Sequence, residues 1–193
     1  MTKWLSHRMV ERGIIKEEEQ ELYQFGIRNG MILLLNVVTA LVIGLLTEQL
    51  AVVAVFTLSF MVLRSYTGGY HSDSRIFCYL GSNLVLLVPV YTQAVFYKTS
   101  LAWLLAVLLV SAGIIFLLSP MHSKNRKLDK EEQKHFGRKA RLIAALELAV
   151  LGILCHAGQI PYAYAVYTGI CITALFMLVG KAQLWIQSHT ENG

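Results

Sequence analysis

Six long apolar runs are the sequence feature that most restricts how this 193-residue chain can fold. A bilayer core about 30 Å thick needs about 20 helical residues at about 1.5 Å each. A segment inside lipid must satisfy its own backbone hydrogen bonds, which favours helices. The sequence therefore predicts one domain over residues 1–193, an all-α polytopic membrane helical bundle. The runs cover residues 31–46, 50–63, 79–97, 101–118, 142–157 and 162–180.

The first two runs are shorter than the others. They cover residues 31–46 and 50–63, which as helices reach only about 24 and 21 Å. Such segments can borrow flanking residues, thin the bilayer, or enter the membrane and turn back. Whether these two segments span or re-enter is left open by the sequence.

The composition agrees with a membrane protein. Only 15% of the residues are charged, whereas soluble domains carry about 25%. The mean hydropathy is +0.54. The net charge of +5 is a basic balance of the kind that also occurs in nucleic-acid-binding proteins. Here the cations follow the loops between apolar runs, which favours cytoplasmic loops and anionic lipids as the explanation and excludes nucleic acid as a partner.

The distribution of Lys and Arg predicts the orientation in the membrane. If the N-terminus is cytoplasmic, residues 1–29, 64–78, 119–141 and 181–193 lie on that side and hold 16 of the 17 cations. Only Lys98 lies on the far side. Because cytoplasmic loops are enriched in Lys and Arg, both termini are predicted to be cytoplasmic.

Two of these cytoplasmic segments have further features. Residues 1–29 alternate apolar and basic side chains at helical spacing, which predicts an amphipathic segment on the membrane surface, or alternatively a solvated arm. Residues 119–141 form a basic loop, since eight of the 17 Lys and Arg residues lie between Lys124 and Arg141. This loop sets the topology, attracts an acidic partner, or does both.

The densest polar stretch between apolar runs is Arg64–Cys78, which contains Gly68-Gly69 and His71. On one straight helix His71 and Cys78 would stand about 10 Å apart, too far for a hydrogen bond. A bend is therefore needed. The two glycines permit unusual backbone angles, and Asp73 or Ser74 is a favoured N-cap for a helix that continues through Cys78.

This arrangement predicts a reactive thiol. A cysteine in the first turn of a helix feels the positive end of the helix dipole, which favours the thiolate. His71 can take the thiol proton and later protonate a leaving amine. Arg64 and Arg75 add a positive field and could hold carboxylates of a substrate. Which group orients His71 is left open between Asp73, Ser72 and Asn83.

Ordinary explanations compete with this interpretation. A histidine in a loop is usually solvated, and a cysteine in a membrane helix is usually a small apolar filler. Cys155-His156 is a rival pair, although neighbours on a helix point about 100° apart. Cys171 lies in the middle of a run, where packing is expected. Glu147 is an intramembrane carboxylate, hence either a functional group or the structural partner of a cation.

Other enzyme classes have no support. The chain contains no C-x-x-C, no H-E-x-x-H, no G-x-S-x-G, no Walker loop and no G-x-G-x-x-G. Neither a metal nor a cofactor is therefore expected.

At Arg64, Gly68-Gly69, His71 and Cys78 the chain resembles the accessory gene regulator protein B (AgrB-like) family, the membrane peptidases of Gram-positive peptide quorum sensing. The chain length, the order of the apolar runs and the basic stretch after Pro120 are similar too. The resemblance therefore covers most of the chain, but only the His/Cys segment is specific.

The resemblance implies a bacterial membrane enzyme with its active site on the cytoplasmic side. Its substrate is a short AgrD-type precursor peptide with an amphipathic N-terminal helix, a pheromone segment and an acidic C-terminal tail. Cys78 attacks the bond before the tail, with His71 as general base and acid, and Arg64, Gly69, Asp73 and Arg75 bind substrate or support the pair. The resulting thioester closes into a lactone or thiolactone ring. A homodimer is also implied.

Two other functions stay open at this point. A small transporter or export channel for the peptide would use the polar loop and Glu147 as its pathway, without proteolysis. A structural membrane subunit would need neither His71 nor Cys78 for chemistry.

Overall fold

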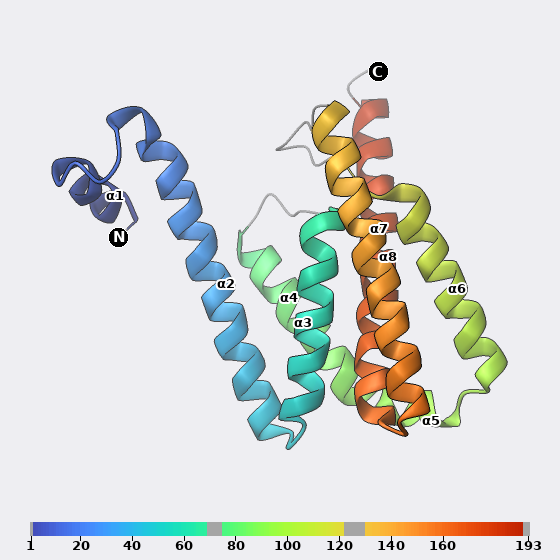
Figure 1. The fold of residues 1–193 in the computed structure, drawn as a ribbon. Coiled ribbons are helices and arrows are strands. Elements are labelled where there is room, and N and C mark those ends of the chain that lie inside the picture. Colours follow the sequence, from blue (N-terminus) through green and yellow to red (C-terminus); the bar gives the residue numbers. More distant parts are fainter. Residues whose placement is uncertain (1, 69–74, 122–129, 191–193) are drawn as a thin grey trace. The chain divides into compact units, whose positions relative to one another are not determined.

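The computed structural model describes residues 2–68, 75–121 and 130–190 (Figure 1). These residues form helices and connecting turns with no strand, which confirms the predicted all-α class. The chain divides into two compact units, residues 1–39 and 40–193. The elements are α1 (Thr2–Glu11), the 3₁₀ turn η1 (Glu17–Glu19), α2 (Gln20–Leu46), α3 (Leu50–Thr67), α4 (Arg75–Tyr91), α5 (Gln93–Lys98), α6 (Leu101–Leu118), α7 (Lys130–His156) and α8 (Ile160–Thr190).

Four helices of the described chain are long and apolar enough to cross a bilayer, and α4 contributes a shorter apolar helix over Tyr79–Tyr91. Many large apolar side chains on these helices are exposed, and Leu109 of α6 is 71% exposed. Exposure of this extent in water would leave a very large apolar surface. In a bilayer the same surface contacts lipid, so the chain is a membrane protein. The four helices lie within Glu17–Leu46, Leu50–Thr67, Leu101–Leu118 and Ile160–Ile186.

The first unit contains α1, η1 and the first part of α2. Gly13 has a φ of 66° and ends the helical stretch that begins with α1, so the N-terminal segment is not one continuous helix. Ser6 is buried, and Gln20 Nε2 donates a hydrogen bond to its hydroxyl at 3.5 Å. Ile15 is buried as well, whereas Trp4 is exposed and has the Arg8 guanidinium 5.4 Å from its ring centroid.

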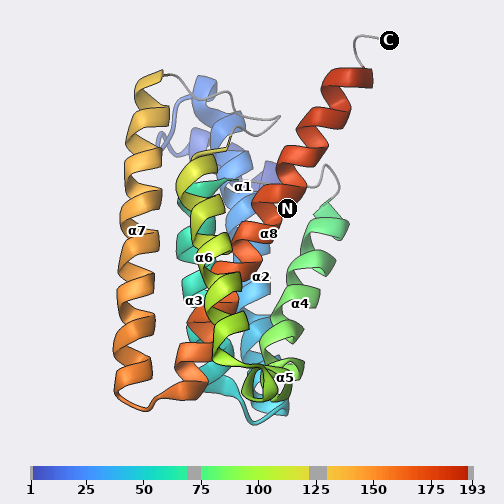
Figure 2. The ribbon, with the colours of Figure 1, turned by 90° about the vertical axis from the view of Figure 1, so that its right-hand side faces the viewer.

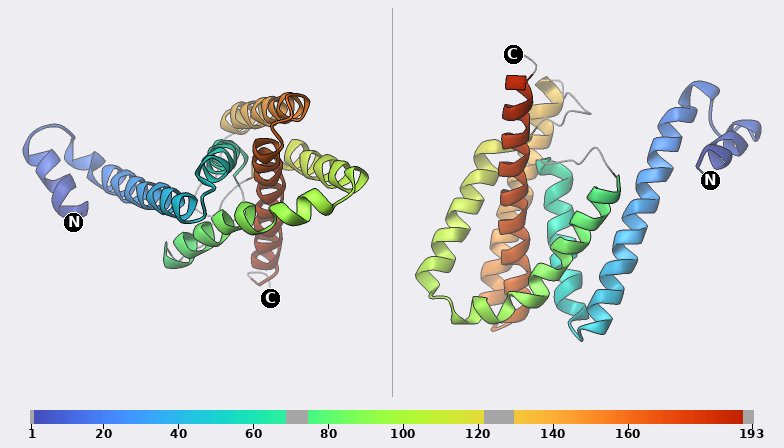
Figure 3. Two further views of the ribbon diagram at one scale, coloured as in Figure 1. Left: turned by 90° about the horizontal axis from the view of Figure 1, so that it is seen from below. Right: turned by 180° about the vertical axis from the view of Figure 1, so that it is seen from behind.

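The second unit is built around α8. Seen along the helices, α8 lies between α3, α6, α7 and α4 (Figure 3), and the side view shows α7 and α4 on opposite sides of it (Figure 2). The side chains of α8 that face these neighbours are small or apolar and buried, including Ala165, Val166, Ile170 and Met177. The core of the second unit is therefore arranged around α8, whose several faces pack against different neighbouring helices.

The turn between α2 and α3 is tight. Glu48 adopts a φ of 57°, and Gln49 N donates to Gly44 O at 2.9 Å. A Cβ on Gly44 would lie 2.8 Å from Leu50 Cα, so only glycine permits this close approach. The helices are also longer than the first two apolar runs, with 27 residues in α2 and 18 in α3. Both helices borrow flanking residues.

The third apolar run is divided, since α4 ends at Tyr91 and α5 begins at Gln93. Pro89 lies inside α4 and lacks the N–H that would continue the hydrogen-bond ladder. Thr92 then bonds the carbonyl of Val88 and contacts the Tyr164 hydroxyl at 2.6 Å. The polar contact with α8 stabilises a bend at Thr92 that hydropathy alone does not predict.

The second half of the basic segment predicted over residues 119–141 is helical. The described part of α7 includes Lys130 to Arg141. The segment from Lys130 to Arg141 is rich in Lys, Glu, Gln, Arg and Ala, which are good helix formers. The basic residues of this half therefore project from a helix.

Candidate functional site

The candidate site lies at the end of the second unit where α3 and α6 end and α4 and α7 begin, which is the upper end in Figure 1 and is called the Gly68 end below. Helix α3 ends at Thr67, and Gly68 follows with φ 71° and ψ −152°. This region of backbone space is almost restricted to glycine. A Cβ on Gly68 would also lie 2.5 Å from the carbonyl oxygen of Met121. The chain therefore leaves α3 through a turn that requires glycine.

Most of the predicted site residues follow this turn. Gly69, His71, Ser72 and Asp73 lie outside the described residues. So do the side chains of Arg75 and Cys78, although the backbone of both belongs to α4. Arg75 is the first described residue of α4, and Cys78 follows it three residues later in the same helix. The separation between His71 and Cys78 stays a prediction, but α3 ends at Thr67 and Cys78 belongs to a separate helix.

Arg64 lies in the last turn of α3 and bonds the backbone just beyond it. Its Nη1 donates a hydrogen bond to the carbonyl oxygen of Gly68, one of the groups that a helix end leaves unpaired. Its guanidinium carbon lies 5.3 Å from the ring centroid of Phe176 on α8. The side chain is half-buried. Arg64 thus connects the end of α3 to α8, and its role in substrate binding or support stays a prediction.

The start of the 119–141 segment packs against the same turn. Met121 N donates to the carbonyl oxygen of Thr67 at 2.9 Å. A Cβ on Gly137 would lie 3.0 Å from Pro120 Cδ, so α7 also packs closely against the residues that follow α6. The end of α3, the residues after α6 and the first described turns of α7 therefore pack together around Gly68.

Three side chains of α3 and α7 form a cation–aromatic cluster, defined as Tyr66, Phe136 and Lys139. The Tyr66 and Phe136 ring centroids are 6.3 Å apart, and Lys139 Nζ lies 5.8 Å from the Tyr66 ring. Nothing in the local pattern identified Tyr66 as a partner of α7. The three-residue spacing of Phe136 and Lys139, which places both on one helical face, is the signal that could have indicated a shared contact.

Several exposed cations extend from this cluster along the beginning of α7. Arg141 Nε donates to the carbonyl oxygen of Phe116 at the end of α6, at 3.1 Å. Arginine and lysine on an exposed helical face create a positive potential that attracts anions over several ångströms. The Gly68 end is consequently basic on the side formed by α7. The exposed members are Lys134, Arg138, Lys139 and Arg141.

A polar contact lies deeper in the bundle, below the Gly68 end. Ser59 of α3 donates a hydrogen bond from Oγ to Glu147 Oε2 of α7 at 2.8 Å. A Cβ on Gly169 of α8 would lie 2.5 Å from the Ser59 Oγ. Glu147 therefore contacts a neutral serine at the meeting point of three helices.

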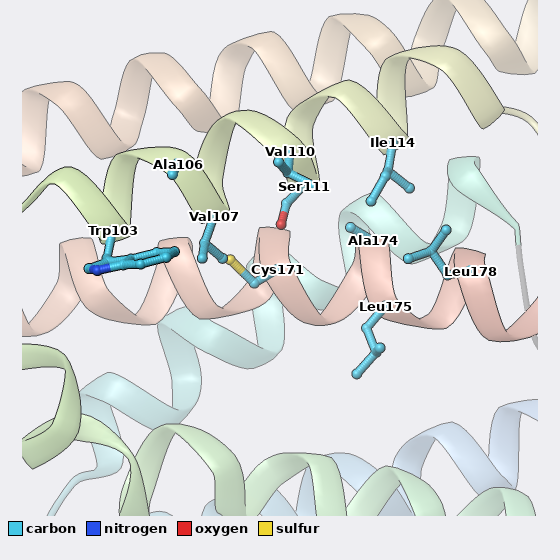
Figure 4. Close-up of a pocket in the computed structure, with 10 residues that line it drawn as sticks. All are labelled: Trp103, Ala106, Val107, Val110, Ser111, Ile114, Cys171, Ala174, Leu175 and Leu178. Carbon is cyan, nitrogen blue, oxygen red and sulfur yellow. The ribbon is translucent and has the colours of Figure 1, made fainter. Parts of the chain in front are cut away.

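The remaining cysteines lie elsewhere. Cys155 and His156 end α7, on the opposite end of the helix from the Gly68 end, and both are exposed. Cys171 of α8 lines an apolar groove of about 360 Å³ facing α6, with Ser111 opposite (Figure 4). Trp103, Val107 and Leu178 form much of its remaining wall. Among the described residues, no three His, Cys, Asp or Glu side chains gather as metal ligands would.

Comparisons with known proteins agree on one family. The family model for accessory gene regulator B matches residues 1–178. A putative AgrB-like protein of Clostridium perfringens is 23% identical over 148 residues, covering 74% of this chain and 69% of that protein. Accessory gene regulator protein B of Staphylococcus intermedius is 26% identical over 156 residues, covering 79% of this chain and 80% of that protein. No solved structure was found to match the chain.

Proposed function

The chain belongs to the accessory gene regulator B family, and from that premise we propose that it is a membrane cysteine endopeptidase that removes the acidic tail of a small quorum-sensing precursor peptide. The peptide is of the AgrD type, with an amphipathic start, a pheromone segment and the tail. One observation carries the proposal. Helix α3 ends at Thr67 before Gly68, and Cys78 belongs to a separate helix, α4, seven residues after His71 in the sequence.

The reaction proceeds through a thioester. His71 accepts the thiol proton, and the Cys78 thiolate attacks the carbonyl carbon before the tail. The carbon–nitrogen bond breaks, and His71 returns the proton to the leaving amine of the tail. The free amides at the start of α4 stabilise the oxyanion of the tetrahedral intermediate. The pheromone segment is then held on Cys78 as an acyl-enzyme.

Ring closure uses the same two groups. His71 takes a proton from a Cys or Ser side chain of the bound peptide, and that side chain attacks the thioester carbon. The carbon–sulfur bond to Cys78 breaks, and the proton returns to the Cys78 thiolate. The product is a lactone or thiolactone. A site that excludes water favours this transfer over hydrolysis of the thioester.

The position in the membrane is part of the proposal. The Gly68 end faces the cytoplasm, because that orientation places nearly all Lys and Arg residues on the cytoplasmic side. The N-terminal segment lies on the membrane surface, which the exposed Trp4 and Ile14 beside Arg8 and Arg12 favour. A precursor adsorbed to the same surface reaches the site by diffusion in two dimensions. The enzyme acts as a homodimer, as the family resemblance implies.

The basic side of α7 attracts the acidic tail. We therefore expect Lys134→Glu to raise the KM for tail release by about tenfold at low ionic strength, while kcat stays unchanged, since Lys134 is exposed on α7 and does not belong to the cation–aromatic cluster. Initial rates in proteoliposomes against precursor concentration measure both constants. The effect should shrink at high salt, because exposed charges are screened.

Lys98→Glu is the matched control, with the same charge change on α5, away from the Gly68 end. Its KM should equal that of the unchanged protein. An equal rise in KM for both variants, or an effect of Lys134→Glu that persists on a precursor with a neutral tail, would contradict attraction of the tail by α7.

The basic test of the function uses the purified full chain in liposomes with a synthetic AgrD-type precursor peptide that carries an acidic C-terminal tail. Mass spectrometry should detect the free tail and the cyclic product. A precursor that stays intact, or that is moved intact across the vesicle membrane, would remove the peptidase proposal.

A further inference from the structure

The contact between Ser59 and Glu147 lies in the apolar middle of the bundle and has no place in the reaction described above. Ser59 is buried and Glu147 is half-buried, and the hydroxyl donates to the carboxyl at 2.8 Å. Their surroundings are apolar, including Leu63, Ala144 and Leu151. An ionisable group among apolar side chains of a membrane protein has a high desolvation cost, and such a group usually has a functional or structural role.

The contact belongs to a single antiparallel register of α3 and α7. Ser59 faces Glu147, and Tyr66 faces Lys139. The two contacts are separated by seven residues on α3 and eight on α7, or about 11 and 12 Å along the helices. The middle of the bundle and the Gly68 end are thus held by the same alignment.

No neighbouring register satisfies the carboxyl in the same way. A shift of α3 by one turn moves it about 5.4 Å and replaces Ser59 by Val55 or Leu63 opposite Glu147, both of which are apolar. A single buried polar residue is a well-attested means of fixing helix register. Apolar contacts alone are weaker determinants of register, because lipid tails compete with them.

The third helix restricts Ser59 further. Gly169 brings the α8 backbone against α3, where a Cβ would lie 2.5 Å from Ser59 Oγ and 3.4 Å from Phe60 N. The hydroxyl is therefore enclosed between α8 and the carboxyl of Glu147. Rotation of α3 about its own axis would move Ser59 out of this space and a larger side chain into it.

We propose that Glu147 is a positioning residue, which through its hydrogen bond to Ser59 fixes the register of α3 and thereby the place of the turn that leads to His71. The proposal rests on the peptidase function above. Thr67, the last residue of α3, lies eight positions after Ser59. A register change at Ser59 is transmitted along the helix to the turn at Gly68.

The kinetic test compares Glu147→Gln, Glu147→Leu and Ser59→Ala for tail release in proteoliposomes. Glu147→Gln should keep kcat within about twofold, because its amide oxygen still accepts the serine hydrogen bond. Glu147→Leu and Ser59→Ala should each lower kcat by about tenfold with KM little changed, since a displacement of the reacting groups by about 1 Å is enough to slow catalysis strongly. The double variant should be no slower than the slower single variant.

Leu151→Ala is the matched control for stability. Leu151 is buried one turn from Glu147 on the same face of α7, and its truncation leaves a cavity that lowers the melting temperature. It does not alter the polar contact, so kcat per folded molecule should be unchanged. If Leu151→Ala lowered kcat as much as Glu147→Leu does, Glu147 would contribute only to stability, and the proposal would be overturned.

A second measurement needs no activity. Tyr66→Cys and Phe136→Cys together, in a chain with Cys78, Cys155 and Cys171 replaced, should be cross-linked efficiently by a short bis-maleimide. The yield should fall several-fold in the Glu147→Leu background and recover with Glu147→Gln. An unchanged yield and an unchanged kcat in Glu147→Leu overturn the inference alone, whereas an unprocessed precursor with the original chain overturns the peptidase function alone.

Discussion

Replacing Cys78 by serine is expected to lower tail release by about a thousandfold or more, because a hydroxyl at this position is a far weaker nucleophile than a thiolate. His71→Ala should lower it by about a hundredfold to ten thousandfold, the range typical of a lost general base. The rate of tail release in proteoliposomes measures both. Since the two groups act as one unit, the double variant should be no slower than Cys78→Ser alone.

Cys155→Ser and Cys171→Ala are the matched controls for these two variants. Cys155 is exposed at the far end of α7, and Cys171 lines the groove beside α6. Both should keep the original rate. Folding of every variant is checked by its melting temperature in detergent. If Cys78→Ser or His71→Ala is folded and still processes precursor, the pair is not catalytic, and a transporter that tolerates both changes becomes the better explanation.

Gly68→Ala is expected to lower tail release by about tenfold to a hundredfold. Gly68 has φ 71° and ψ −152°, a conformation that costs a residue with a Cβ about 1–3 kcal/mol. The added carbon would also lie 2.5 Å from the carbonyl oxygen of Met121. The turn must therefore move, and His71 follows three residues later. The measured quantity is kcat for tail release, with KM expected to change less.

Gly81→Ala is the matched control for Gly68→Ala. Gly81 lies within α4, and a Cβ there meets no atom within 4 Å. Alanine is also the better helix former, so the control should be fully active and at least as stable. A Gly68→Ala variant with the original kcat would show that the turn does not position the reacting groups.

The periodicity and length of the apolar runs were sufficient to predict the helices but not all of their ends. Helix α3 continues past Leu63 to Thr67, and the glycine that follows explains where it stops. The bend at Thr92 depends on Tyr164, a residue 72 positions away. A local pattern contains no information on such a partner, although Pro89 is a visible sign that α4 is interrupted.

Of the candidate site, the end of α3 before Gly68 and a separate helix that contains Cys78 could be predicted from local sequence. The pairing of His71 with Cys78 stays a prediction. The partner of Glu147 could not be predicted in this way. A cation was a reasonable expectation for an intramembrane carboxylate, yet Ser59 lies 88 positions away in sequence and provides the hydrogen bond. The contact of Lys139 with Tyr66 is long-range in the same sense.

The most direct test of the account is to trap the acyl-enzyme. A precursor whose ring-forming Cys or Ser is replaced by alanine can be cleaved but cannot close its ring, so the thioester should accumulate. Intact-protein mass spectrometry should show a gain equal to the precursor without its tail, located on the peptide that contains Cys78 and removed by hydroxylamine. Tail release with no adduct on Cys78, or with the adduct on Cys155 or Cys171, would contradict the account.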